Sequence, residues 1–325
     1  MTFSVPLYAG SVPALITPFR HADGAVDEAS LSALVDRAVR QGSSAIVVCG
    51  STGEAPALLP EEHARIVRIT AETVGSRAGV FVGIGASSTE AAVRLAVSAE
   101  RCGATALLCS APPYVRPGQD GLIAHIRAVA AASILPIILY DVPSRAAIGF
   151  ADDTIARLHD DRLIQALKDA TGDLARVQRL RALCGADFPQ MSGDDATAVA
   201  HLAMGGVGCI SVTANVVPGL CAALQEAWAL HQFDKAFELR DKLAPLHAVL
   251  FRESNPIPVK TALSLLDLCE STLRLPLLHA SETTRLQLAH VLADLIPVEE
   301  WACPDFTDTF DRLRSLGGVD DGEQQ

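Results

Sequence analysis

The chain has 325 residues, of which 50% are hydrophobic and 20% are charged, and its formal net charge is −12. This composition excludes bulk disorder, and the length allows one large domain or two small ones with a sizeable core. The acidic balance argues against nucleic acid and anionic membranes as partners, because both bind through clustered Lys and Arg.

The N-terminus and the cysteines predict a cytoplasmic protein. Residues 1–10 contain no basic residue and no long apolar run, so they do not resemble a secretory signal. The longest stretch of low polarity, 128–140, is shorter than the roughly 20 residues that span a bilayer. Cys49, Cys109 and Cys209 lie in apolar runs, and the eight cysteines are scattered. We therefore expect buried thiols in a reducing compartment rather than a metal site or a disulfide framework.

Eight short apolar runs alternate with longer segments of helical periodicity along the first two thirds of the chain. The runs are rich in Val, Ile, Leu and Ala and alternate little, which is typical of parallel strands buried on both faces. We predict strands at 13–19, 45–50, 80–85, 106–111, 136–142, 163–170, 188–192 and 208–213.

The segments between the strands carry helix signals. The first predicted helix runs from Asp27 to Gly42, and Pro60 and Ser88 mark the beginnings of the next two. After Asn215 only helical periodicity remains, over 217–232, 234–251, 259–268 and 281–296.

Eight strand–helix units predict an α/β fold, a (β/α)₈ TIM barrel with an appended C-terminal helical layer. A doubly wound open sheet is the alternative, but it would normally carry a glycine-rich dinucleotide loop after its first strand, and residues 13–19 are followed by none. We place the barrel at 1–232, the helical layer at 233–296 and an acidic, partly disordered tail at 297–325. The tail holds eight acidic and two basic residues, so it carries −6 of the total charge.

Lys168 is the first candidate for chemistry, because an active site in such a barrel lies at the C-terminal ends of the strands. It ends an otherwise apolar run, whereas the other three lysines lie in C-terminal helical segments where we expect exposed ammonium groups. A barrel interior would desolvate the amine and free it for Schiff-base chemistry. A structural ion pair with Asp169 or another acid is the alternative interpretation.

The same position at the C-terminal end of a strand makes Tyr140 and Arg145 candidates for the site. Tyr140 ends the strand before that of Lys168, where a phenol is placed to move protons to a substrate bound on the lysine. Arg145 stands in the next loop and suits a carboxylate. The alternatives are a structural tyrosine and a solvated arginine.

Two loops complete the candidate set. GSTGE at 50–54 combines small residues with exposed N–H groups that suit an anion, although such a sequence is also common in turns. PPYVRP at 112–117 is stiffened by its prolines and presents Tyr114, and it equally fits an ordinary surface turn.

Seven segments in order resemble the dihydrodipicolinate synthase / N-acetylneuraminate lyase family of class I aldolases. The similarity runs from about residue 10 to about residue 296. It is carried by GSTGE (50–54), PPYVRP (112–117), YDVPSR (140–145), LKDATGD (167–173), SGDDA (192–196), GCISVTAN (208–215) and NPIPVK (255–260).

The resemblance implies a (β/α)₈ barrel and a pyruvate-dependent lyase reaction with no metal and no organic cofactor. It implies that Lys168 forms a Schiff base with pyruvate and that Tyr140 moves protons to and from the intermediate. Ser51, Tyr140 and Tyr114 would form a proton relay, in which Tyr114 enters the site of a neighbouring subunit.

The same resemblance implies the binding groups and the assembly. Thr52 and the backbone of Ile210 would hold the pyruvate carboxylate and its surroundings, and Arg145 would bind the carboxylate of the second substrate, aspartate β-semialdehyde. The implied assembly is a homotetramer built from dimers.

The sequence departs from the family pattern in two places. Ser51 stands where threonine is usual, which keeps the hydroxyl but loses the methyl that restricts χ1. Pro60 and Pro113 stand where lysine-sensitive members carry histidine and tyrosine, and neither proline has a side-chain donor. We therefore expect activity to be retained and inhibition by L-lysine to be weak or absent.

Two other functions remain open on the sequence. The first is an aldolase of the same family with another aldehyde partner: a keto-deoxy sugar acid, hydroxy-oxoglutarate or N-acetylneuraminate enzyme. Arg145 and Tyr114 favour aspartate semialdehyde over these. The second is a barrel that binds a small molecule without catalysis, against which the presence of both Lys168 and Tyr140 argues.

Overall fold

The structure, a computed structural model, describes the backbone of residues 8–299 and the side chains up to Leu295. Its centre is a barrel of eight parallel strands in the order β1-β8-β7-β6-β5-β4-β3-β2. A parallel bridge between Ala14 and Val47 joins the two ends of this sheet. The predicted TIM barrel is therefore confirmed. The strands are β1 (Gly10–Pro13), β2 (Ala45–Val48), β3 (Gly79–Gly83), β4 (Ala106–Ser110), β5 (Ile137–Asp141), β6 (Ala166–Asp169), β7 (Gln190–Ser192) and β8 (Gly208–Ser211).

The first strand lies earlier than predicted. We expected it at 13–19, but β1 ends at Pro13, and bonds to the neighbouring strands continue to Leu15, whose N–H donates to the Val47 carbonyl at 2.8 Å. From the next residue on, the backbone bonds to other groups: the Ile16 N–H donates to Asn215 Oδ1 at 2.9 Å. Pro18 has no N–H to give to a ladder. The apolar run therefore marked a buried segment correctly but not a strand.

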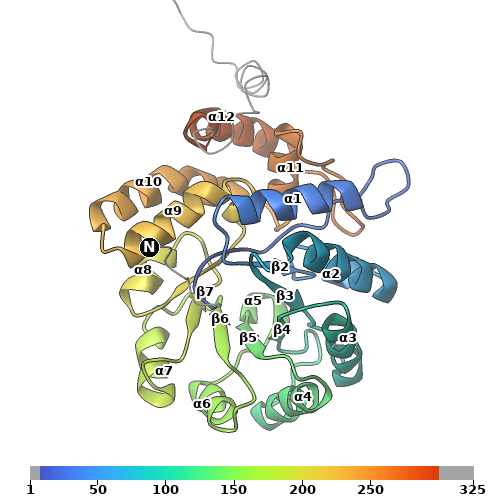
Figure 1. Ribbon diagram of the computed structural model, residues 1–325, viewed down its shortest axis with the longest axis vertical. Coiled ribbons are helices and arrows are strands. Elements are labelled where there is room, and N and C mark those ends of the chain that lie inside the picture. The colour runs from blue at the N-terminus through green and yellow to red at the C-terminus, as the bar shows by residue number, and fades with distance from the viewer. Residues whose placement is uncertain (1–7, 300–325) are drawn as a thin grey trace, which may run out of the picture.

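Helices surround the barrel on its outside (Figure 1). The side chains of Asp27 and Ser88 cap α1 and α3 by accepting from the backbone N–H three residues on, and Pro60 begins α2. The helices up to the last strand are α1 (Glu28–Arg40), α2 (Pro60–Val74), α3 (Thr89–Arg101), α4 (Gln119–Ala132), α5 (Pro143–Ala146), α6 (Asp152–Asp160), α7 (Arg176–Cys184) and α8 (Ala198–Ala203).

Four further helices follow β8. They are α9 (Pro218–Ala229), α10 (Phe233–Leu250), α11 (Ile257–Leu265) and α12 (Glu282–Glu299). Figure 1 shows α11 and α12 stacked outside α1, with α10 beside α9. The last three, α10 to α12, form the predicted C-terminal layer, whereas α9 falls in the part that we placed in the barrel. The domain division at 232/233 stays a prediction, and the predicted tail lies outside the described residues from position 300 on.

The strands separate two apolar layers. Val47, Leu108, Ile138 and Ala166 belong to a cluster inside the barrel. The residues next to them in sequence, such as Leu139 and Leu167, pack outward against the helices. Because side chains alternate along a strand, this pattern fixes the direction of the polar residues that end β5 and β6.

Candidate active site

Lys168 and Tyr140 lie side by side on the inner face of the barrel. They are register partners on β6 and β5, and each follows an inward-facing apolar residue two positions earlier, Ala166 and Ile138. Lys168 is 6% exposed, and its Nζ lies 4.3 Å from the centroid of the Tyr140 ring. Asp169 points to the opposite face, where it pairs with Arg176. An ion pair of Lys168 with Asp169, one form of the alternative interpretation, is therefore wrong.

Two pockets open at this end of the barrel. The inner pocket has a volume of about 190 Å³, and Lys168 lies in its wall with Ser51, Thr52 and Tyr140. The outer pocket, of about 420 Å³, shares Ser51, Tyr140 and Arg145 with it. The structure thus brings five of the seven predicted site residues together. The inner pocket therefore gives access to the Lys168 amine, and the outer pocket adjoins it through shared lining residues.

A glycine allows the inner pocket to form around Lys168. A Cβ built on Gly193 would lie 3.1 Å from Lys168 Cε and 2.8 Å from the Ala170 Cβ. The loop after β7 therefore approaches the lysine closely only because this residue lacks a side chain. Asp194, the next residue, also lines the inner pocket.

The loop that carries Ser51 and Thr52 has an unusual backbone. Cys49 and Glu54, on either side of it, both have a φ of +54°, a conformation that L-residues seldom adopt. The loop is held from below, where Thr17 Oγ1 donates to the Gly53 carbonyl at 2.7 Å. It presents Ser51 half-buried in both pockets and Thr52 almost fully buried.

A buried ion pair holds the other end of this loop. The Glu54 carboxylate lies 2.5 Å from Lys260 Nζ, and the side chains are 2% and 0% exposed. The ammonium also lies 4.1 Å from the centroid of Phe19 and donates to the Thr272 carbonyl at 2.8 Å. Our expectation that the lysines other than Lys168 are exposed is therefore wrong for Lys260. Helical periodicity does not reveal that α11 packs over a carboxylate.

Asn255 is a site residue to which the sequence analysis assigned no role. Its Nδ2 donates to Thr52 Oγ1 at 2.9 Å, and its backbone carbonyl accepts from Arg145 Nη2 at 3.0 Å. It is 8% exposed and lines both pockets. Asn255 therefore joins two candidate binding side chains that come from opposite halves of the barrel. Its place at the start of the NPIPVK segment was the available signal.

Two predicted site residues do not line either pocket of this chain. Tyr114 is 91% exposed, with a φ of +74°, on the loop after β4. Ile210 is buried in β8 beside Val12 of β1. The roles predicted for them therefore stay predictions.

The two prolines at the positions where lysine-sensitive members of the family carry histidine and tyrosine also lie near the site. Pro113 lines the outer pocket, and Pro60 begins α2 just beyond the loop that carries Ser51. Neither offers a side-chain donor there, so the predicted insensitivity to L-lysine stands as a prediction.

Comparisons with known proteins decide the family. The model of the Dihydrodipicolinate synthetase family matches residues 7–295. The chain belongs to this family. A 4-hydroxy-tetrahydrodipicolinate synthase of Parvibaculum lavamentivorans is 46% identical over 85% of this chain and 94% of its own. That of Rhodospirillum centenum is 46% identical over 86% and 95%.

Solved structures of the family have the same fold. The chloride-inhibited dihydrodipicolinate synthase of Acinetobacter baumannii, complexed with pyruvate, superposes with a TM-score of 0.85 at 39% identity. The match covers 88% of this chain and 98% of that one. Family membership therefore extends over the whole barrel and the C-terminal helices.

Other expectations concern compartment and cysteines. Within residues 8–299, each helix is too short or too polar to cross a membrane. Cys49, Cys109 and Cys209 are buried as predicted, and burial raises the pKa of Cys109 to about 12. In that described part, no group of three or more His, Cys, Asp or Glu side chains has an arrangement that could hold a metal ion.

Proposed function

We propose that the chain is a lyase that condenses pyruvate with L-aspartate 4-semialdehyde to 4-hydroxy-tetrahydrodipicolinate, a step of lysine and diaminopimelate biosynthesis. The observation that carries the proposal is Lys168, an almost fully buried amine in the wall of a small pocket, with a phenol beside it. The names of the related enzymes, and the pyruvate bound to one of them, support this substrate pair.

The proposed first half of the reaction joins pyruvate to the lysine. The Lys168 amine attacks the pyruvate carbonyl, and loss of water with uptake of one proton gives a protonated imine. The imine draws electrons, so the methyl group loses a proton and an enamine forms. Tyr140 is placed to take and return these protons, with Ser51 next in the relay. Thr52, which lines the inner pocket, holds the carboxylate, and the family resemblance adds the backbone of Ile210 for its surroundings.

The proposed second half uses the outer pocket. The enamine carbon attacks the aldehyde carbon of aspartate semialdehyde, whose carboxylate pairs with Arg145. The substrate amine then attacks the imine carbon and displaces the Lys168 amine, which closes the ring and regenerates the enzyme. The guanidinium of Arg145, fixed by Asn255, favours an aldehyde that bears a carboxylate.

The aldehyde partner is tested by comparing turnover of aspartate semialdehyde with turnover of keto-deoxy sugar acids, 4-hydroxy-2-oxoglutarate and N-acetylneuraminate. We expect the condensation with aspartate semialdehyde to have the highest kcat/KM. We also expect Arg145→Ala to raise the KM for aspartate semialdehyde while that for pyruvate changes less. A higher kcat/KM for any of the other substrates would contradict this assignment.

We further propose a cytoplasmic homotetramer built from dimers, in which Tyr114 completes the site of a neighbour. Its 91% exposure, outside both pockets of its own chain, supports the idea. Co-expression of Lys168→Ala with Tyr114→Ala tests it, because a mixed dimer would contain one site with both wild-type residues. We expect each variant alone to be nearly inactive and the mixture to regain activity. A fully active monomer in sedimentation at assay concentration would contradict it.

A further inference from the structure

The strands that carry Tyr140 and Lys168 also carry a pair of carboxylates on their outer faces. Asp141 follows Tyr140, Asp169 follows Lys168, and the two aspartates are register partners. They are 1% and 6% exposed. Because side chains alternate along strands, any shift of β5 against β6 that moves the aspartates also moves the tyrosine and the lysine.

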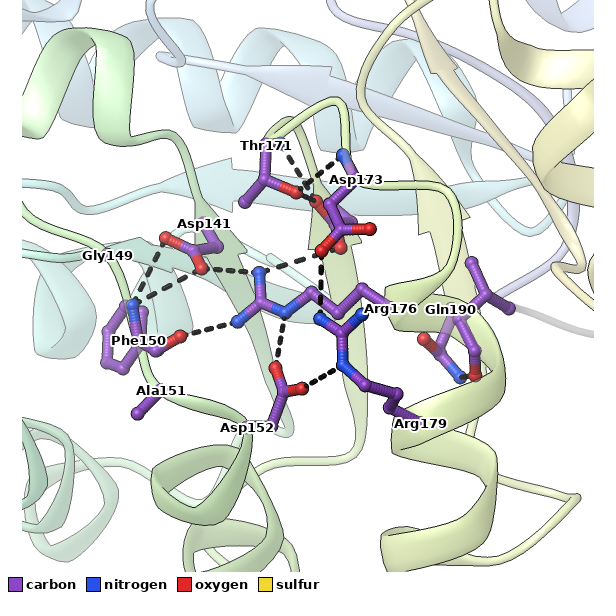
Figure 2. Close-up of polar contacts among 12 residues, drawn as sticks. Asp141, Gly149, Phe150, Ala151, Asp152, Thr171, Asp173, Arg176, Arg179 and Gln190 are labelled. Carbon is purple, nitrogen blue, oxygen red and sulfur yellow. Dashed lines mark hydrogen bonds and ion pairs between the residues drawn. The ribbon is translucent and has the colours of Figure 1, made fainter.

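One guanidinium bridges both aspartates. Arg176, at the start of α7, is 4% exposed, and its Nη1 lies 2.7 Å from Asp141 Oδ2 and 3.6 Å from Asp169 Oδ2. The same side chain donates to Asp152 at 2.9 Å and to the Phe150 carbonyl at 2.5 Å. Figure 2 shows Arg176 between Asp141 and Asp152. We call Arg176 and the four residues that it contacts the Arg176 clamp: Asp141, Phe150, Asp152, Asp169 and Arg176.

The carboxylates of the clamp depend on the arginine to different degrees. Asp141 also accepts the Phe150 N–H, at 3.3 and 3.4 Å. Asp169 Oδ1 accepts from the Thr171 N–H and hydroxyl, at 2.8 and 2.6 Å. Within the described structure, Asp169 Oδ2 accepts no hydrogen bond, so the Arg176 charge is what faces it.

Without the arginine, two buried carboxylates would face each other across adjacent strands. Burial raises the pKa of Asp141, and Asp169 acts in the same direction, whereas Arg176 opposes both effects. Breaking such a cluster by removing one partner leaves a buried charge uncompensated, which is strongly destabilising. The two carboxylates are register partners, so this charge would lie at the contact of β5 with β6 beside the site.

We propose that Arg176 is a positioning residue that sets the relative placement of Tyr140 and Lys168 from the outer face of the barrel. This inference rests on the proposed function, because it assumes that the two inner side chains act together. Arg176 lies on the side of the strands opposite to the pocket and contacts no substrate. A displacement of about 1 Å between reacting groups is enough to lower a rate by roughly 100-fold.

Arg179, one turn further along α7, provides a matched control. It pairs with Asp152 at 2.7 Å and with Asp173 at 2.9 Å, and its side chain is 47% exposed. It therefore shares a carboxylate with the clamp, but its two ion pairs are with Asp152 and Asp173 and reach neither Asp141 nor Asp169. Replacing Arg179 tests the general effect of losing a charge on this helix, without releasing the strands.

The experiment compares wild type, Arg176→Lys, Asp141→Asn and Arg179→Met. Folding is checked by circular dichroism and thermal unfolding. The rate of imine formation is measured by quenching pyruvate incubations with borohydride at successive times, and kcat and KM are measured for both substrates. Lysine keeps the charge but lacks the planar fork that reaches several acceptors at once. Asn at 141 keeps the shape and removes the charge.

We expect Arg176→Lys and Asp141→Asn to lower the rate of imine formation and kcat by roughly 10- to 100-fold, on the scale of a misplaced reacting group. The KM for aspartate semialdehyde should change less than kcat does, since Arg145 keeps its Asn255 contact. Arg179→Met should keep the wild-type rates. Loss that only tracks the folded fraction indicates a structural role and overturns the inference.

Two further outcomes also overturn it: wild-type rates in both folded clamp variants, or an equal loss in Arg179→Met. If Arg176→Lys does not fold, the milder Asp141→Asn decides the question by the same rates. Failure of the proposed function looks different, because wild type itself then forms no adduct with pyruvate.

Discussion

The hydroxyl of Ser51 is the single group whose contribution to the rate is easiest to isolate. It is half-buried and lines both pockets, as Tyr140 does. We predict that Ser51→Ala lowers kcat by about 100-fold, the lower end of the usual range for loss of one proton-transfer group. Steady-state kinetics with both substrates measures this effect.

Ser51→Thr is the matched control for that prediction. It keeps the hydroxyl and adds the methyl group that restricts χ1. We expect its kcat to equal or exceed that of wild type. A Ser51→Ala enzyme with wild-type kcat would remove Ser51 from the relay, and a strong loss in Ser51→Thr would show that the pocket has no room for the methyl.

The sequence predicted single residues well where strand alternation decides their direction. Lys168 and Tyr140 were found because each ends an apolar run of a barrel strand. Asn255, Lys260 and Arg176 received no role, because their importance comes from contacts across the fold. A helical pattern states which residues share a face, but not that the opposite surface offers a carboxylate.

The ion pair between Glu54 and Lys260 is the main tie between the loop after β2 and α11. Burial lowers the pKa of Lys260, while the adjacent Glu54 carboxylate opposes this. Removing one partner of a buried pair typically costs about 3–5 kcal/mol. We predict that Lys260→Met lowers the free energy of unfolding by about that amount, measured by urea denaturation.

Two companion variants test this interpretation. In Glu54→Gln with Lys260→Met, no buried charge is left unpaired, so part of the stability should return. Lys235→Met, at an exposed position of α10, should change the stability little. If the double variant is less stable than Lys260→Met by as much as Glu54→Gln alone destabilises the wild type, the two side chains do not act as a pair.

The elements themselves were largely predictable, with one instructive exception. The runs for β2 to β8 each overlap an observed strand, because parallel strands buried on both faces leave an unbroken apolar signal. The first run failed because it stays apolar and buried after β1 ends, where the Ile16 N–H bonds to a side chain instead of a strand. Burial alone therefore does not identify a strand where prolines interrupt the ladder.

Four buried histidines couple the stability of the whole molecule to pH. His63, His125, His201 and His247 are at most 7% exposed, and desolvation lowers the pKa of each below its ordinary value of 6.5. The folded state therefore binds fewer protons than the unfolded chain as the pH falls through 6.5. We predict that the free energy of unfolding decreases between about pH 7.5 and about pH 5.5.

Urea denaturation at the two pH values measures this change. His201, whose ring nitrogens have no hydrogen-bond partner in the described structure, gives the sharpest variant. His201→Leu should reduce the pH dependence, and exposed His279→Leu should leave it unchanged. A free energy of unfolding that is constant or rises on acidification over this range would contradict the prediction. The arginine-paired Glu62 does not interfere, because its pKa lies below 4.5 and its contribution to stability is lost only at lower pH.

The central claim for the whole molecule is a pyruvate Schiff base on Lys168. Wild-type protein is incubated with pyruvate, reduced with borohydride, and examined by intact mass and peptide mapping. The account predicts one adduct per chain, carried by Lys168 and absent from Lys168→Ala, which also loses synthase activity. Absence of the adduct from wild type, or its presence on Lys260 or another lysine instead, would contradict the account.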